Sequence, residues 1–387
     1  MANNNDNKIL NVPPLRFPEF SGEWKKVRLG EECNMLCGYA FNGEDIVEQG
    51  SYLLMRGINI TEGSIRHSPE LDRYYSGSIE KLDKYKLAVG DLVIGMDGSK
   101  VGRNSAIVSS YEDGSYLVQR VCRIKSSIGN NYILQLINNT KFHQYVDTVK
   151  TSSAIPHISL GDIQNFRISI PPTQDETDKI AKLFLLLDER IATQNKIIED
   201  LKKLKSAISE RLFKSVKGST VLLSAICDIV KGKQINGENL SENGNYYVMN
   251  GGIEPSGYYD DYNVDANTIS ISEGGNSCGY VQFNTIPFWS GGHCYSIQNV
   301  TENVDNLYLY HYLKSKEGDI MKLRIGSGLP NIQKKDLAKF KVTVPTLERQ
   351  KTISTFLSVL ERKVQIGADI LIAMQSEKLY LLRHMFI

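Results

Sequence analysis

The chain has 387 residues, with 45 Lys and Arg against 44 Asp and Glu, so its formal net charge is +1. This length exceeds one ordinary domain and predicts two or three. The balanced charge excludes a protein that holds a polyanion through a global basic excess, so any nucleic-acid surface must be local. Hydrophobic residues make up 41% and charged residues 23%, which is typical of a folded chain.

The first 20 residues are rich in Asn and lack the apolar core and cleavage pattern of a signal peptide. No stretch approaches the roughly 18 consecutive apolar residues of a membrane span. We therefore expect a flexible N-terminus over 1–20 and a cytoplasmic protein with no membrane association. The six Cys form no CxxC pair, which argues against a zinc ribbon and predicts reduced, mostly buried thiols.

The sequence contains a long internal repeat. Residues 152–171 (SSAIPHISLGDIQNFRISIP) align with 326–345 (GSGLPNIQKKDLAKFKVTVP) at an offset of 174. Residues 29–43 align with 223–237 at an offset of 194, which pairs Gly38 with Gly232. The two halves therefore begin and end alike, and the first has 20 more residues in its middle.

Each half is predicted to form a small, mostly β domain, over 21–173 and 216–346. Apolar residues alternate in DLVIG (91–95), YLVQRVCRI (116–124), TISIS (268–272) and VQFN (281–284), a pattern typical of strands. Each domain should also contain one or two short helices, such as 132–139 and 308–315.

After Pro171 and Pro345 the apolar spacing changes to a heptad, which predicts long helices over 174–215 and 347–387. The predicted fold class is α+β: two tandem domains, each followed by a helix, with the helices packed as an antiparallel coiled coil of pseudo-two-fold symmetry. The predicted seam consists of Phe184, Leu187, Ile191, Ile198, Leu201, Leu357, Leu360, Val364, Leu371 and Met374.

Polar seam positions recur at equivalent places, Lys205 with Lys378 and Gln194 with Gly367. We interpret them as devices that fix the helix register. Because Gly lowers helix stability by about 1 kcal/mol relative to Ala, Gly367 should mark a close crossing of the two helices.

Several segments resemble the DNA-specificity subunit of type I restriction-modification systems: LRFPEFSGEWKKVRLG (15–30), MNGGIEPSGYYDDYN (249–263), TISISEGGNSCGYVQF (268–283), PFWSGGHCYSI (287–297) and the twin segments before Pro171 and Pro345. The resemblance implies two target-recognition domains, each reading one half of a bipartite double-stranded DNA site, with helices that set the spacer. It implies methyltransferase subunits, two of them, and a restriction/translocase subunit as partners. No cofactor is expected on this chain, since S-adenosylmethionine, ATP and Mg would be bound by those partners.

The sequence shows no catalytic machinery or metal site of its own. A methyltransferase needs an [ND]-P-P-[YF] turn, and Asn11-Val12-Pro13-Pro14 is interrupted by Val12; a P-loop is also missing. His293 and Cys294 are adjacent in a predicted strand, so their side chains point to opposite faces. Cys294 aligns with Cys122, which indicates a core position. We therefore predict a non-catalytic specificity subunit.

Any DNA contacts must lie on loops, because residues 21–173 contain 17 basic and 17 acidic residues and residues 216–346 contain 11 and 13. Arg and Gln suit guanine and adenine edges, and the Gly-rich loops of the second half offer amides and hydroxyls. The candidate DNA contacts are Arg56, Lys100, Arg103, Gln119, Arg120, Ser153, His157, Asn250, Asn276, Ser290, His293, Ser327 and Asn331.

For each of these residues the alternative is a solvated charge, an ion pair within the domain, or plain turn chemistry. For the whole chain the alternative is a two-lobed coiled-coil scaffold that binds proteins instead of DNA, which the neutral charge leaves open.

Overall fold

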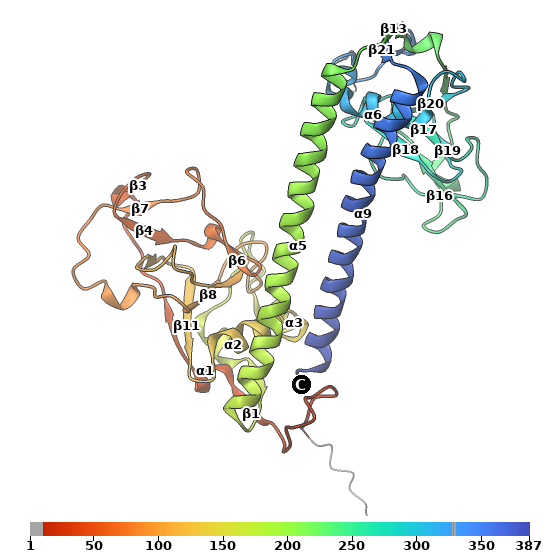
Figure 1. Cartoon of the computed structure of the whole chain (residues 1–387). Helices are drawn as coiled ribbons and strands as arrows, with labels where there is room; N and C mark the ends of the chain where they lie inside the picture. Colours follow the sequence, from red (N-terminus) through yellow and green to blue (C-terminus); the bar gives the residue numbers. More distant parts are fainter. Residues whose placement is uncertain (1–10, 327, 329) are drawn as a thin grey trace, which may run out of the picture. The chain divides into compact units, whose positions relative to one another are not determined.

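A computed structural model describes residues 11–326, 328 and 330–387. The chain divides into two compact units, one with residues up to Thr193 plus Leu371–Ile387, the other with Gln194–Ile370. Both boundaries fall inside the two long helices, α5 (Gln174–Ser215) and α9 (Leu347–His384), which Figure 1 shows in green and blue. Each unit therefore combines one domain with a part of each helix.

The domain of the first unit is built on two four-stranded sheets. One is antiparallel, in the order β2 (Cys33–Cys37), β11 (Val121–Ser126), β8 (Leu92–Gly95) and β9 (Ser105–Ile107). The other has the order β10 (Tyr116–Leu117), β4 (Tyr52–Met55), β7 (Tyr74–Tyr75) and β3 (Ile46–Val47), with β10 parallel to β4. Two further pairs are β1 (Lys25–Arg28) with β12 (Arg167–Ile170), and β5 (Ile60–Thr61) with β6 (Ser64–Ile65). The helices are α1 (Leu29–Glu32), α2 (Asn130–Ile137), α3 (Thr140–Val149) and α4 (Leu160–Asn165).

The domain of the second unit repeats this plan. Its antiparallel sheet has the order β14 (Asp228–Lys231), β20 (Cys294–Gln298), β17 (Thr268–Ser272) and β18 (Val281–Asn284). Its smaller sheet has the order β16 (Tyr258–Tyr259), β15 (Tyr246–Met249) and β19 (Trp289–Ser290), with β19 parallel to β15. A separate pair joins β13 (Ser219–Leu222) to β21 (Lys341–Val344). The helices are α6 (Asn306–Ser315), α7 (Glu317–Met321) and α8 (Lys334–Ala338).

The extra residues of the first domain lie mainly between β4 and β8, where the hairpin β5–β6 is inserted. Two sequence predictions need correction. Each domain contains more short helices than the one or two expected. The run 116–124 is two strands in two different sheets, because Arg120 has a φ of +70° and breaks the extended pleat.

Both helices complete the core of each domain. In the first unit, the Phe184 ring of α5 lies 5.6 Å from that of Phe386, which lies 5.5 Å from Tyr132 of α2. In the second unit, Phe213 of α5 packs on Tyr308, and Leu357 of α9 is fully buried. Burial of each such side chain contributes about 1.5–3 kcal/mol, so the helices are integral to both folds.

Within each unit the two helices run antiparallel, and ion pairs join them at equivalent places. In the first unit Lys378 Nζ lies 2.5 Å from Asp188 Oδ1, and in the second Lys205 Nζ lies 2.6 Å from Glu361 Oε1. Asp188 and Glu361 are separated by the same 173 residues as the two lysines. The two seam lysines therefore meet oppositely charged partners on the neighbouring helix, as a register-fixing device would.

The predicted seam residues are all buried or half-buried, while their neighbours along the helices are mostly exposed. Gly367 lies at a close approach within the second unit. A Cβ there would lie 3.2 Å from both Gln194 Nε2 and Ile198 Cγ1, and Gln194 Nε2 donates a hydrogen bond of 2.9 Å to the Gly367 carbonyl. In the described ranges, no helix has the length and apolar character needed to cross a bilayer.

Candidate nucleic-acid interface

Four segments of the first domain are tied together by backbone hydrogen bonds at one end of its sheets. Val118 N donates to Met55 O at 3.0 Å and Met96 N donates to Arg120 O at 2.9 Å. Gly98 N donates to Pro156 O at 3.0 Å, and the next residue after that proline, His157, bridges to Asp97. We call the surface of residues 56, 97–103, 119–120 and 153–157 face 1.

The second domain has the same three hydrogen bonds and the same bridge at equivalent positions. Gly291 N donates to Met249 O at 2.8 Å, and Glu273 N donates to His293 O at 2.9 Å. Gly275 N donates to Pro330 O at 3.0 Å, and the residue after it bridges to Gly274. We call the surface of residues 250, 274–277, 292–293 and 331 face 2.

The equivalent hydrogen bonds show which candidate residues of the first domain correspond to which candidates of the second, although the sequence suggested them from unrelated motifs. The equivalent positions are Arg56 with Asn250, Arg120 with His293, and His157 with Asn331. The turn that begins at Gly98 corresponds to the turn that begins at Gly275. One scaffold thus presents two different sets of side chains.

At each face, a glycine allows two backbone segments to approach closely. Gly38 N donates to Val121 O and Gly232 N donates to Cys294 O, at 2.9 and 2.8 Å. A Cβ on Gly38 would lie 2.1 Å from Val118 O, and one on Gly232 would lie 2.2 Å from Gly291 O. Only glycine permits this approach of two backbones, which explains why the repeat places glycine at both positions.

The candidate side chains of face 1 differ in whether they already have a partner within the domain. Gln119 and Arg120 are exposed, and no described residue makes a hydrogen bond or ion pair with the Arg120 guanidinium. Lys100 pairs with Glu62 and Arg103 with Asp147, each at 2.9 Å. Exposed pairs of this kind contribute only about 0–1 kcal/mol, so both side chains can exchange their partner for a phosphate.

The remaining face 1 candidates are engaged locally. Arg56 is half-buried and its Nη1 donates to Leu71 O at 3.3 Å. Ser153 Oγ donates to Ile155 O at 2.6 Å, and the His157 ring shares a hydrogen bond with Thr151 Oγ1 at 3.0 Å. The contacts of Ser153 and His157 shape the loop before Pro156.

Face 2 has fewer charged side chains than face 1. Asn276 and Asn331 are exposed, and His293 has 63% of its side chain exposed. Asn250 Oδ1 accepts a hydrogen bond of 3.0 Å from His293 N and so holds the turn. Ser327 lies outside the described residues.

The structure corrects two predictions about this region. Ser290 is only 1% exposed, and its Oγ donates to Cys294 O at 3.4 Å, because it occupies the inward position of β19. It therefore does not face DNA. The hydrogen bonds of Gly38 and Gly232 align Cys294 with Val121 and not with Cys122. Burial raises the pKa of the Cys294 thiol to about 11, which keeps it protonated and unreactive.

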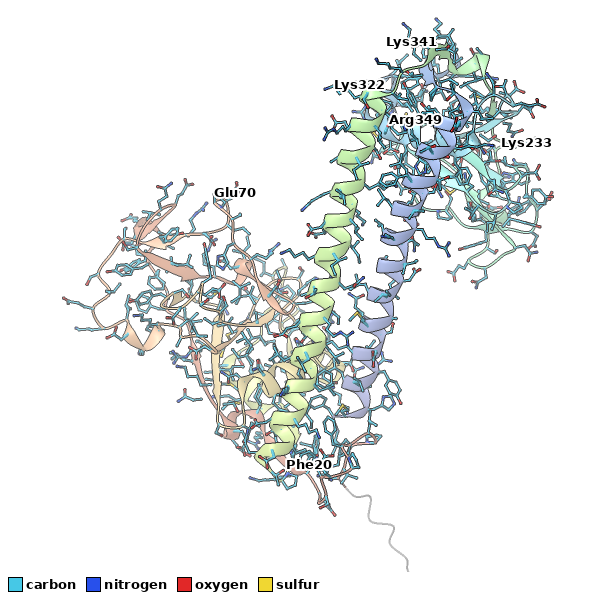
Figure 2. All side chains as sticks on the ribbon, in the orientation of Figure 1. Phe20, Glu70, Lys233, Lys322, Lys341 and Arg349 are labelled. Atoms are coloured by element: carbon cyan, nitrogen blue, oxygen red, sulfur yellow. The ribbon has the colours of Figure 1, made fainter. Side chains whose placement is uncertain are left out.

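Two lysines that were not predicted from the sequence lie beside face 2. Lys231 Nζ lies 2.6 Å from Glu273 Oε1. Lys233 is exposed, and its backbone N donates to Ser290 O at 2.8 Å, which places it next to the turn at Gly291. Figure 2 shows Lys233 on the surface of the second domain, apart from Lys341 of β21. The signal was available in the repeat, since both lysines flank Gly232.

A family model described as the type I restriction modification DNA specificity domain matches residues 21–203 and 218–375. These two matches cover most of the chain and correspond to its two halves. The chain therefore belongs to this family, as the sequence resemblance predicted, and carries the domain twice.

Individual relatives agree. A putative type I specificity subunit of Mycoplasma pneumoniae is 32% identical over 145 residues, which are 37% of this chain and 38% of that protein. The putative type I restriction enzyme MjaX specificity subunit of Methanocaldococcus jannaschii is 24% identical over 331 residues, 74% of this chain and 75% of that one. Both are named as specificity subunits, in agreement with the prediction of a non-catalytic chain.

The match to the Mycoplasma pneumoniae protein thus spans well under half of that protein's length. The crystal structure of a type I restriction-modification S subunit from M. genitalium has a TM-score of 0.70 at 18% identity and covers 97% of this chain and 99% of that one. This similarity shows a shared fold: tandem domains with long helices.

Proposed function

We propose that this chain is the specificity subunit of a type I restriction-modification complex, and that it reads a bipartite DNA site with face 1 on one half and face 2 on the other. The chain supplies no catalysis. It directs methyltransferase subunits, and a restriction/translocase subunit with them, to the site. The two helices set the length of the unread spacer.

The observation that carries this proposal is the backbone equivalence of the two faces. Arg120 and His293 occupy the same place on the same scaffold but offer different hydrogen-bonding groups. Direct readout in the major groove depends on such differences, since each base pair presents its own pattern of donors and acceptors.

The nearly neutral charge limits what this chain does alone. Phosphate contacts dominate affinity for DNA, and each face offers few unpaired basic residues. We therefore expect tight binding only when methyltransferase subunits contribute further phosphate contacts. These partners would bring S-adenosylmethionine, and the restriction subunit ATP and Mg.

The test is to co-express the chain with its methyltransferase subunits and to map methylated bases in the host genome. We expect a split motif with an unread spacer. R120A should relax or abolish recognition of one half, and H293A of the other, each lowering affinity about tenfold.

Two variants serve as matched controls: R167A on β12 and K341A on β21, exposed basic residues at equivalent positions outside both faces. Neither should alter the motif. A contiguous motif would contradict the proposal. If the chain assembles with its partners but substitutions on neither face change DNA binding, the alternative of a protein-binding scaffold would be favoured.

A further inference from the structure

A carboxylate beneath face 2 has one oxygen paired twice and the other unpaired. Glu273 Oε1 accepts from Lys231 Nζ at 2.6 Å and from Tyr295 OH at 3.1 Å. Glu273 Oε2 is buried and has no hydrogen-bond partner among the described residues. Buried polar atoms are nearly always paired, so an orphaned carboxylate oxygen under a binding surface indicates a donor that is still to be engaged.

The imidazole of His293 is a candidate for this donor. Its Nδ1 lies 3.7 Å from Glu273 Oε2, just beyond hydrogen-bond distance, and the side chain is 63% exposed. Its backbone is fixed on both sides, because Asn250 Oδ1 accepts from His293 N at 3.0 Å and Glu273 N donates to His293 O at 2.9 Å. A small rotation of the ring on this fixed backbone brings Nδ1 into contact with the carboxylate.

That contact determines which groups the ring presents to solvent. When Nδ1–H donates to the carboxylate, the neutral ring keeps Nε2 as an acceptor on its outer side. In the major groove, an acceptor pairs with an exocyclic amino group, N4 of cytosine or N6 of adenine.

The first domain provides an internal comparison. The positions equivalent to Lys231, Glu273 and Tyr295 hold Cys37, Met96 and Cys122, and Cys37 Sγ lies 3.7 Å from Met96 Sδ. Arg120 lies above these sulfur atoms where His293 lies above a carboxylate. Arg is permanently charged and presents donors whatever lies beneath it, whereas the group that a neutral His presents at Nε2 depends on whether Nδ1 carries the proton.

We propose that Glu273 is a positioning residue that orients His293 as a hydrogen-bond acceptor for an exocyclic amino group in the half-site read by face 2. This inference rests on the proposed function and assigns to face 2 the class of base that it reads.

Two measurements on the full chain test it. In long-range ¹H–¹⁵N spectra of the wild type, bound to its methyltransferase subunits, His293 should carry its proton on Nδ1, and E273Q should shift the ring toward the Nε2–H form. In binding assays, E273Q and H293A should each lower the affinity for cognate DNA about tenfold. The double variant should bind cognate DNA with the same affinity as H293A alone, because Glu273 acts through His293.

A third variant tests the acceptor role directly. H293R places at face 2 the side chain that face 1 carries at the equivalent position, and because Arg offers only donors, H293R should bind the cognate site no better than H293A. An Nε2–H ring in the wild type would overturn the proposal even if E273Q fails to fold. Further weakening by E273Q in the H293A background would also overturn it.

R120A separates this inference from the proposed function. If R120A changes recognition of its half-site while H293A changes nothing, only the inference about His293 fails. If neither variant affects DNA binding, the proposed function fails.

Discussion

Replacing Gly38 or Gly232 by Ala should disrupt one domain at a time. In each case the new methyl group would meet a backbone carbonyl oxygen, at 2.1 Å for Gly38 and 2.2 Å for Gly232. An ordinary contact begins near 3.4 Å, so the two backbone segments must separate by more than 1 Å. Neither neighbour is a flexible side chain that could move aside.

The separation should break the hydrogen bonds that join these segments. In the second domain they are Gly232 N to Cys294 O and Lys233 N to Ser290 O, both 2.8 Å. Loss of two such bonds costs about 1 kcal/mol each, and overpacking adds about 1–3 kcal/mol. We expect G232A to lower the free energy of unfolding of its unit by about 3–5 kcal/mol, and G38A to do the same in its own unit.

Urea unfolding combined with hydrogen exchange measures this effect unit by unit. In G232A, amides of β14 and β20 should exchange faster while those of β2 and β11 stay unchanged, and G38A should give the reverse. G43A and G237A are matched controls, because they are repeat-equivalent glycines with open space around the added Cβ. Stabilities of G38A and G232A within about 0.5 kcal/mol of the controls would refute this reasoning.

Three further predictions concern the helices and pH. G367L should destabilise the second unit by about 1–3 kcal/mol through overpacking against Gln194 and Ile198, while G367A should be nearly neutral because gained helix propensity offsets a tight contact; urea unfolding distinguishes the two. Burial lowers the pKa of His311 to about 4, so only the unfolded chain takes up its proton between pH 6.5 and 4. The free energy of unfolding of the second unit should therefore fall by about 2 kcal/mol between pH 7 and pH 5, as measured by urea titration at both pH values. In H311N this fall should be smaller. The same fall in H311N and in the wild type would contradict the prediction. Deleting one heptad from each helix should shorten each helix by about 10 Å and shrink the proposed unread spacer, which methylation mapping would measure.

Sequence reasoning was most successful where a physical constraint repeats. The duplication, the heptads and the paired glycines each leave a periodic signal, and the structure places Gly38 and Gly232 at equivalent close contacts. The partners of Lys205 and Lys378 could not be chosen from one helix alone, because each lies on the other helix.

The detailed chemistry of the faces was less accessible. Lys100 and Arg103 are paired with acids 38 and 44 residues away, which no local pattern indicates. Ser290 precedes two glycines and was therefore predicted to lie on a loop, yet it belongs to strand β19, which directs its side chain inward. The importance of Glu273 depends on burial beneath a turn, which only the folded chain reveals.

The most direct test of the central claim is the methylated motif produced by the assembled complex with wild-type, R120A and H293A chains. Two equivalent faces predict a split motif in which R120A alters one half only and H293A alters the other half only. A contiguous motif, or both variants altering the same half, would contradict the claim that each face reads its own half-site.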